Sequence, residues 1–199
     1  METSATVSQE LSARAGKYLT FVLADEEYGL EILKVREIIG MMDDTAVPRT
    51  PSYVKGVINL RGKVIPVIDL RLKVGMPETE RTDQTCIIVV DIGNVEMGII
   101  VDRVSEVLDI AADDIEDAPS FGSQVNTEFI LGMGKANGKV TILLDISKLL
   151  SQADTEALSA VGDIASVAAR DGDGGDDGPQ AQEAPEAVGE SQDSDEASQ

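Results

Sequence analysis

Two copies of one sequence pattern occur in this chain, and the repeat constrains the fold more than any other feature. Each copy has a glycine inside an apolar run, an acidic-apolar triplet, a second glycine and a Gly-Lys-Val run. The matched positions are 28–30 and 97–99, and 37–39 and 106–108, at an offset of 69 residues, then Gly56 and Gly132, and 62–64 and 138–140, at an offset of 76. Matching glycines indicate matching backbone needs, either turns with positive φ or close approach of strands. The repeat therefore predicts two related units, each too small to bury much surface alone.

The segments between the turns are short and apolar, which is typical of β-strands. Candidate strands lie at 17–23, 28–32, 53–60, 63–70, 86–91 and 97–101. Turn residues separate the paired segments at 25–26, 61–62 and 92–94. Short strands interrupted this often favour β-barrels over a helical bundle. We therefore expect a mostly β fold with two barrels and short helices.

The two ends of the chain differ from its middle. Residues 1–15 are polar, and we expect a flexible N-terminus. Residues 151–199 carry 13 acidic residues and one basic residue, which is over half of the formal net charge of −21. Leu158, Val161 and Ile164 have the spacing of one helix face, so a short helix is expected within 151–170. Residues 171–199 have a composition that does not offset the entropy of ordering, and we expect a disordered acidic tail.

The charge and the missing residue types exclude several functions. A surface this acidic repels nucleic-acid phosphates and anionic lipid headgroups, so nucleic-acid binding is not expected. The longest strongly apolar run, Cys86–Val90, is far too short to cross a bilayer, so no membrane insertion is expected. The chain has no histidine, which removes the commonest general base and metal ligand and any phosphohistidine relay. We expect no cofactor and no metal site. Cys86 is interpreted as a small apolar core residue, and an enzyme that uses Asp69 and Asp145 is kept as a remote alternative.

Six apolar residues at related places in the two copies have two interpretations. They are Ile32, Val35, Ile38 and Ile39 in the first copy and Val104 and Val107 in the second. All six fit a buried core. If some of them stay exposed, they form an apolar groove that takes the apolar face of an amphipathic helix. The residues alone leave both interpretations open.

Three runs of the sequence resemble the CheW family of bacterial chemotaxis proteins. They are 17–39 (KYLTFVLADEEYGLEILKVREII), 51–71 (PSYVKGVINLRGKVIPVIDLR) and 98–108 (GIIVDRVSEVL), in the family's order within residues 16–150. The resemblance implies two SH3-like five-stranded β-barrels packed on a shared apolar core. It places the first barrel at about 16–75 and the second at about 82–150, and it leaves strand exchange between them open.

The same resemblance implies a non-catalytic adaptor in the cytoplasm, recruited to membrane-associated receptor arrays. Its implied partners are the cytoplasmic tip of methyl-accepting chemoreceptors and the CheW-like regulatory domain of the chemotaxis histidine kinase, with further copies of the chain in array rings. The implied receptor-binding residues are Ile32, Val35, Glu37, Arg61, Val104 and Val107. The implied kinase-binding residues are Met41, Met42 and Gly56. A CheW-like scaffold for pilus motility or for a second-messenger pathway is the alternative.

Overall fold

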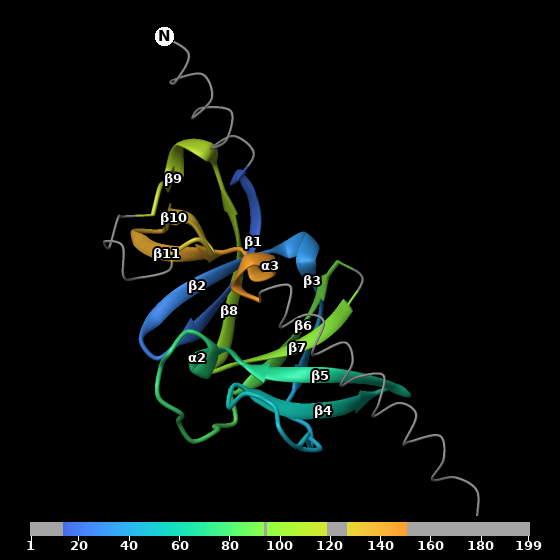
Figure 1. Ribbon diagram of the computed structural model, residues 1–199. Coiled ribbons are helices and arrows are strands. Elements are labelled where there is room, and N and C mark those ends of the chain that lie inside the picture. The colour runs from blue at the N-terminus through green and yellow to red at the C-terminus, as the bar shows by residue number, and fades with distance from the viewer. Residues whose placement is uncertain (1–13, 94, 119–126, 151–199) are drawn as a thin grey trace, which may run out of the picture.

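The computed structural model describes residues 14–93, 95–118 and 127–150, which form two β-sheets (Figure 1). The strands are β1 (Gly16–Leu23), β2 (Glu26–Glu31), β3 (Val35–Gly40), β4 (Val54–Leu60), β5 (Lys63–Asp69), β6 (Cys86–Ile92), β7 (Val95–Val101), β8 (Arg103–Ile110), β9 (Ile115–Glu116), β10 (Ile130–Ala136) and β11 (Lys139–Leu144). The helical turns are η1 (Ile32–Lys34), α2 (Leu70–Lys73), η2 (Ala112–Asp114) and α3 (Ile146–Leu149). The predicted mostly β class with short helices is confirmed. The expected helix within 151–170, the expected tail at 171–199 and almost all of the expected flexible N-terminus lie outside the described residues.

Each sheet takes strands from both copies of the repeat. Sheet A has the strand order β8-β1-β2-β11-β10-β9, and sheet B has the order β3-β6-β7-β5-β4. In sheet A, Gly29 on β2 lies opposite Leu143 on β11 in a parallel pair. In sheet B, Gly98 on β7 lies opposite Val67 on β5 in the matching parallel pair. In the structure, the first hairpin of each copy therefore pairs with strands of the other copy, an exchange that the expected boundaries of 16–75 and 82–150 left open.

The matched glycines Gly56 and Gly132 mark places where two backbones approach closely. A side chain at Gly56, whose φ is +145°, would meet the backbone carbonyl of Thr45, which bridges to Val57. A Cβ at Gly132 would lie 2.6 Å from the carbonyl oxygen of Glu116 on β9. Real Cβ atoms essentially never come that close to another heavy atom. In both copies of the repeat, this glycine therefore lies where two chain segments cross closely.

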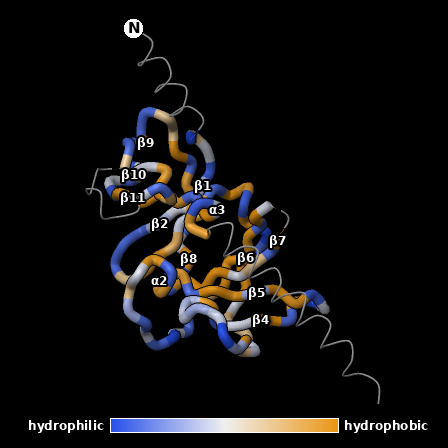
Figure 2. The backbone as a smooth tube through the Cα atoms, viewed as in Figure 1, coloured by the Kyte–Doolittle hydropathy of each residue, from blue (hydrophilic) through white to orange (hydrophobic). Residues whose placement is uncertain are grey.

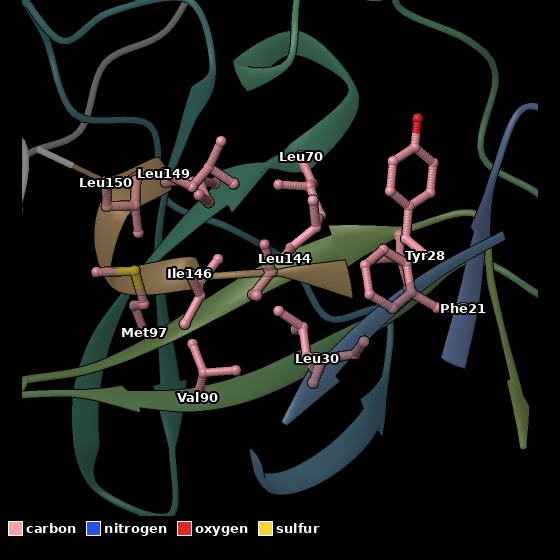
Figure 3. Packing of buried hydrophobic residues seen from close by; sticks show 14 of the residues in the cluster. Phe21, Tyr28, Leu30, Leu70, Val90, Met97, Leu144, Ile146, Leu149 and Leu150 are labelled. Carbon is pink, nitrogen blue, oxygen red and sulfur yellow. The ribbon is translucent and has the colours of Figure 1, made fainter. Parts of the chain in front are cut away.

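One buried cluster joins the two sheets, and we call it the inter-sheet core. Its members are Leu19, Phe21, Leu23, Tyr28, Leu30, Val54, Ile68, Leu70, Ile88, Val90, Ile92, Met97, Ile99, Val101, Leu144, Ile146, Leu149 and Leu150. Figure 3 shows the side chains of Leu30, Val90 and Leu144 pointing into the space between the strands, and in Figure 2 the hydrophobic colour follows β5, β6 and β7. Full burial of one such side chain stabilises the fold by roughly 1.5–3 kcal/mol. Shared burial therefore holds the two copies together.

The opposite face of each sheet carries a smaller cluster. In sheet B it consists of Ile58, Ile65, Val67, Ile87, Val89 and Ile100, and in sheet A of Tyr18, Ile110, Ile115 and Leu143. Position Ile65 of the first copy corresponds to Thr141 of the second copy. Thr141 is fully buried, and its hydroxyl has no hydrogen-bond partner among the described residues. The second copy thus places a polar atom where the first has a methylene group.

Replacing Thr141 by valine is expected to raise the free energy of unfolding by about 1 kcal/mol, because an unpaired buried hydroxyl costs roughly 1–3 kcal/mol. Urea unfolding measures this difference. Thr20 is the matched control, since it is equally buried and its hydroxyl donates to the carbonyl oxygen of Glu106 at 3.0 Å and accepts from the Glu106 N–H at 3.2 Å. Thr20→Val should therefore be destabilising. A Thr141→Val variant less stable than the native chain would show that the hydroxyl is satisfied.

Candidate functional site

Strand β3 forms one edge of sheet B and contains a β-bulge between Val35 and Glu37. Directly opposite residues on antiparallel strands point to the same face of a sheet. Val35 lies opposite Val90, and because of the bulge Ile38 lies opposite Ile88. Both partners belong to the inter-sheet core, so Val35 and Ile38 share the core-facing side of the sheet. Val35 packs against the core, whereas Ile38 is 45% exposed.

Strand β8 repeats this arrangement at one edge of sheet A. Val104 and Val107 lie 69 residues after the two β3 residues, and their partners on β1 are Phe21 and Leu19 of the inter-sheet core. Val104 packs against the core, whereas Val107 is 49% exposed. Each edge strand therefore carries an apolar strip of two residues, of which one packs against the inter-sheet core and the other is about half exposed to solvent. We call the four residues Val35, Ile38, Val104 and Val107 the edge-strand apolar surface.

Two further apolar residues lie near this surface, and the sequence predicted a binding role for only one of them. Ile32, an expected receptor-binding residue, packs against the inter-sheet core from η1. Leu33 follows it and is 92% exposed, yet the matching position of the second copy holds Asp102, so the repeat gives no signal for Leu33. Ile38 is one of the six residues for which the sequence left core and groove open, and it is the repeat match of Val107, but it is not among the receptor-binding residues that the resemblance implies.

Glu37 and Arg61, both expected at the receptor site, are in direct contact. The Nη1 and Nη2 groups of Arg61 donate to Oε1 and Oε2 of Glu37 at 2.9 and 2.7 Å. The two hydrogen bonds to this carboxylate raise the pKa of the Arg61 guanidinium, whose side chain is 75% exposed. Glu37 lies opposite Val89, a member of the smaller cluster of sheet B. The ion pair therefore lies on the face of β3 opposite to Val35 and Ile38.

Arg61 occupies a turn position that arginine rarely takes. Arg61 and Gly62 have φ values of +54° and +86° and alone connect β4 to β5, which is a type I′ turn. Asparagine or glycine is favoured at the first position of such a turn. The matching turn of the second copy has Asn137 at this position, with φ of +52°. Such a conformation persists where surrounding contacts hold it, and the two hydrogen bonds to Glu37 hold the Arg61 side chain here.

The three residues expected at the kinase site differ in exposure. Met42 is exposed, and Met41 packs partly against the smaller cluster of sheet B. Gly56 is buried, and its missing side chain admits the backbone of Thr45. Gly56 thus positions the segment that follows β3, and the exposed contact atoms belong to its neighbours.

The two carboxylates of the enzyme alternative are helix N-caps. Asp69 Oδ1 accepts the N–H of Leu72 at 3.3 Å, and Asp145 Oδ1 accepts the N–H groups of Ser147 and Lys148 at 3.0 and 3.2 Å. Capping satisfies N–H groups that have no partner within a helix. This role accounts for both carboxylates without any chemistry.

Cys86 is partly buried, and it packs against the inter-sheet core as expected. Burial raises the pKa of its thiol, which stays protonated at neutral pH. Within the ranges that the structure describes, no group of three or more acidic or cysteine residues is arranged to hold a metal ion. No described helix is long and apolar enough to cross a membrane.

Comparison with known proteins places this geometry in a family. The CheW-like domain matches residues 17–154. The chain belongs to the CheW family. A chemotaxis protein CheW from Klebsiella aerogenes is 41% identical over 162 residues, which cover 81% of this chain and 96% of the relative. One from Helicobacter pylori is 36% identical over 151 residues, which cover 76% of this chain and 91% of the relative.

A solved structure agrees with this assignment. The crystal structure of the scaffolding protein TtCheW from Thermoanaerobacter tengcongensis is 37% identical and matches with a TM-score of 0.65, over 71% of this chain and 97% of that chain. The CheW resemblance predicted from the sequence is confirmed. CheW proteins are non-catalytic scaffolds of chemotaxis signal transduction. The edge-strand apolar surface and the Glu37–Arg61 pair both lie within the family match, which ends at residue 154.

Proposed function

We propose that this chain couples chemoreceptors to the chemotaxis histidine kinase, with the edge-strand apolar surface as the receptor-binding site. The observation that carries the proposal is the matched pair of apolar strips on β3 and β8. Val35 and Val104 are held by the core, while Ile38 and Val107 leave apolar side chains in solvent. Exposed apolar patches mark interaction sites. An amphipathic helix has the complementary surface, and the cytoplasmic tip of a chemoreceptor is the helical partner that the CheW resemblance implies.

The Glu37–Arg61 pair supports the same site from the opposite face of β3. Glu37 lies on the strand between Val35 and Ile38, so its contact ties the β4–β5 turn to the strand that carries the receptor site. A guanidinium has five N–H donors in a fixed fork, and Glu37 takes two of them. The remaining donors of Arg61 are available to a carboxylate or carbonyl group of a partner.

The kinase site is proposed at Met41 and Met42, in the segment that Gly56 allows to cross β4. Met42 is exposed there, and methionine side chains adapt well to binding surfaces. The partner is the CheW-like regulatory domain of the kinase. Binding receptor and kinase at once raises the effective concentration of each for the other. This coupling takes place in the cytoplasm at membrane-associated receptor arrays, where copies of the chain also contact one another in rings.

Co-elution tests the coupling directly. The full chain, a soluble receptor-tip fragment and the kinase are mixed and separated by size-exclusion chromatography. The proposal predicts one peak that contains all three proteins, and receptor and kinase in separate peaks when the chain is left out. A chain that retains one partner and never both would contradict the coupling role.

Replacing Arg61 by asparagine is expected to lower receptor-dependent kinase activation several-fold while the variant stays as stable as the native chain. Asparagine suits the positive φ of this turn, as Asn137 does in the second copy, so the substitution removes the guanidinium and keeps the turn. The measurement is the kinase phosphorylation rate in a mixture with receptor, together with the melting temperature of the variant. Arg61→Lys, which keeps the charge and loses the fork, serves as the comparison. Full activation by Arg61→Glu would remove Arg61 from the site.

A further inference from the structure

A single residue, Asp102, joins the two sheets between β7 and β8. Strand β7 of sheet B ends at Val101, and β8 of sheet A begins at Arg103. The N–H of Asp102 donates to the carbonyl oxygen of Val22 on β1 at 3.2 Å. Oδ2 of its carboxylate accepts the N–H of Ala24, in the turn between β1 and β2, at 2.7 Å. Asp102 therefore holds the start of β8 against the β1–β2 hairpin.

Arg71 binds the same carboxylate from α2, which directly follows β5 of sheet B. Its Nη1 donates to Oδ2 of Asp102 at 2.5 Å, and its Nε donates to the carbonyl oxygen of Pro77 at 3.2 Å. Figure 1 shows α2 beside the lower end of β8. The side chains of Arg71 and Asp102 are 13% and 28% exposed, so water and salt screen this ion pair less than a fully exposed one. We call the contacts among Arg71, Asp102 and Ala24 the β7–β8 pin.

The repeat shows that the fold also has a junction without such a pin. The three matched positions hold other residues: Ala24, Arg71 and Asp102 correspond to Gly93, Ser147 and Leu33. Leu33 lies between β2 of sheet A and β3 of sheet B and is 92% exposed. A leucine side chain has no donor or acceptor, so it makes no ion pair at this second junction.

The turn at Ala24 indicates that the pin holds the hairpin firmly. Ala24 has a φ of +55°, and the matching Gly93 has a φ of +58°. A left-handed conformation is unfavourable for alanine and not for glycine. The copy with the carboxylate of Asp102 thus keeps an alanine in this conformation, whereas the copy without it has glycine.

We propose that Arg71 and Asp102 are positioning residues of the receptor site, because they set how the apolar strip on β8 lies relative to the strip on β3. The two strips belong to different sheets, and Val104 follows two residues after Asp102. The inter-sheet core attracts the sheets to each other, but apolar burial is non-directional. Hydrogen bonds have fixed distances and angles. The pin therefore supplies the directional contact between the sheets.

A variant that copies the junction at Leu33 tests the positioning without any receptor. It carries Ala24→Gly, Arg71→Ser and Asp102→Leu. We expect it to fold, because the other copy has these residues at the matched positions. Residual dipolar couplings of the backbone amides report the orientation of sheet A relative to sheet B. This orientation is expected to change in the variant, and an unchanged orientation would overturn the proposal.

Asp102→Asn serves as the second variant and decides the matter if the triple variant does not fold. Asparagine keeps an oxygen that accepts the N–H of Ala24, and it loses the charge that pairs with Arg71. The couplings are expected to change in the same direction and by less than in the triple variant. Native couplings in Asp102→Asn would overturn the role of the ion pair.

The effect on receptor binding rests on the proposed function, whereas the effect on the sheets does not. The triple variant is expected to bind a receptor-tip fragment about fivefold more weakly than the native chain and to bind the kinase equally well. Asp145→Ala is the control for lost stability, because it removes the N-cap of α3 and leaves the β7–β8 pin intact. It should bind both partners like the native chain.

The two proposals fail in different ways. Native receptor affinity in the triple variant would overturn the role of the pin in receptor binding. Failure of the receptor site itself would appear as native-like binding by a chain with Ile38→Asp and Val107→Asp, whatever the sheet orientation in the triple variant.

Discussion

Replacing Ile38 and Val107 together by aspartate is expected to weaken binding of a receptor-tip fragment by about 100-fold or more. Each substitution puts an unpaired carboxylate against the apolar face of the bound helix. Loss of a central interface residue typically costs 2 kcal/mol or more, and each 1.4 kcal/mol is about a tenfold change in affinity. Isothermal titration calorimetry with the fragment measures the change.

Exposure makes this double substitution informative. Ile38 and Val107 are 45% and 49% exposed, so the variant should keep its fold, as circular dichroism would show. Val140→Asp is the matched control, because Val140 is equally exposed and lies outside the edge-strand apolar surface. The control should bind the fragment like the native chain. Native-like binding by the double variant would place the receptor elsewhere.

Replacing Gly56 by alanine is expected to lower the free energy of unfolding by about 3 kcal/mol or more. The new Cβ would collide with the backbone carbonyl of Thr45, and φ is +145°, a conformation that L side chains rarely adopt. A backbone clash cannot be relieved by a rotamer change, and strain at a special φ is among the causes of large destabilisation. Urea unfolding followed by circular dichroism measures the loss.

Gly40→Ala is the matched control in the same sheet. A Cβ at Gly40 has no heavy atom within 4 Å, and Gly40 is exposed at the end of β3. The substitution should leave stability unchanged or raise it slightly, because alanine restricts the unfolded chain. Equal effects of the two substitutions would show that the close crossing at Gly56 contributes nothing to the fold.

The repeat predicted where backbones meet, but the sequence did not determine which strands pair. Gly29 and Gly98 could be matched because glycine reports a local backbone need. Their partners, Leu143 and Val67, belong to the other copy and are typical apolar strand residues that fit either sheet. Pairing between these distant strands depends on packing in the shared core, to which both copies contribute side chains. The hairpin exchange therefore became visible only in the structure.

The candidate site shows the same limit at single residues. Ile38 and Ile39 are identical in type, yet Ile38 is partly exposed on the core side and Ile39 packs against the smaller cluster of sheet B. The β-bulge after Val35 determines which face of the sheet each isoleucine takes, because it shifts the alternation of faces along β3 by one residue. Simple alternation would have placed Val35 and Ile39 on one face. A bulge leaves no clear sequence signal, so the sequence left open whether Ile38 or Ile39 is the exposed member of the strip.

The central claim is that two matched edge strands of a non-catalytic scaffold carry the receptor signal to the kinase. Reconstitution with purified chain, kinase and receptor fragment tests it most directly, with the kinase phosphorylation rate as the measurement. The account predicts that the receptor fragment accelerates phosphorylation only when the native chain is present, and that the Ile38→Asp, Val107→Asp chain does not replace it. Equal acceleration without the chain, or full acceleration with the double variant, would contradict the account.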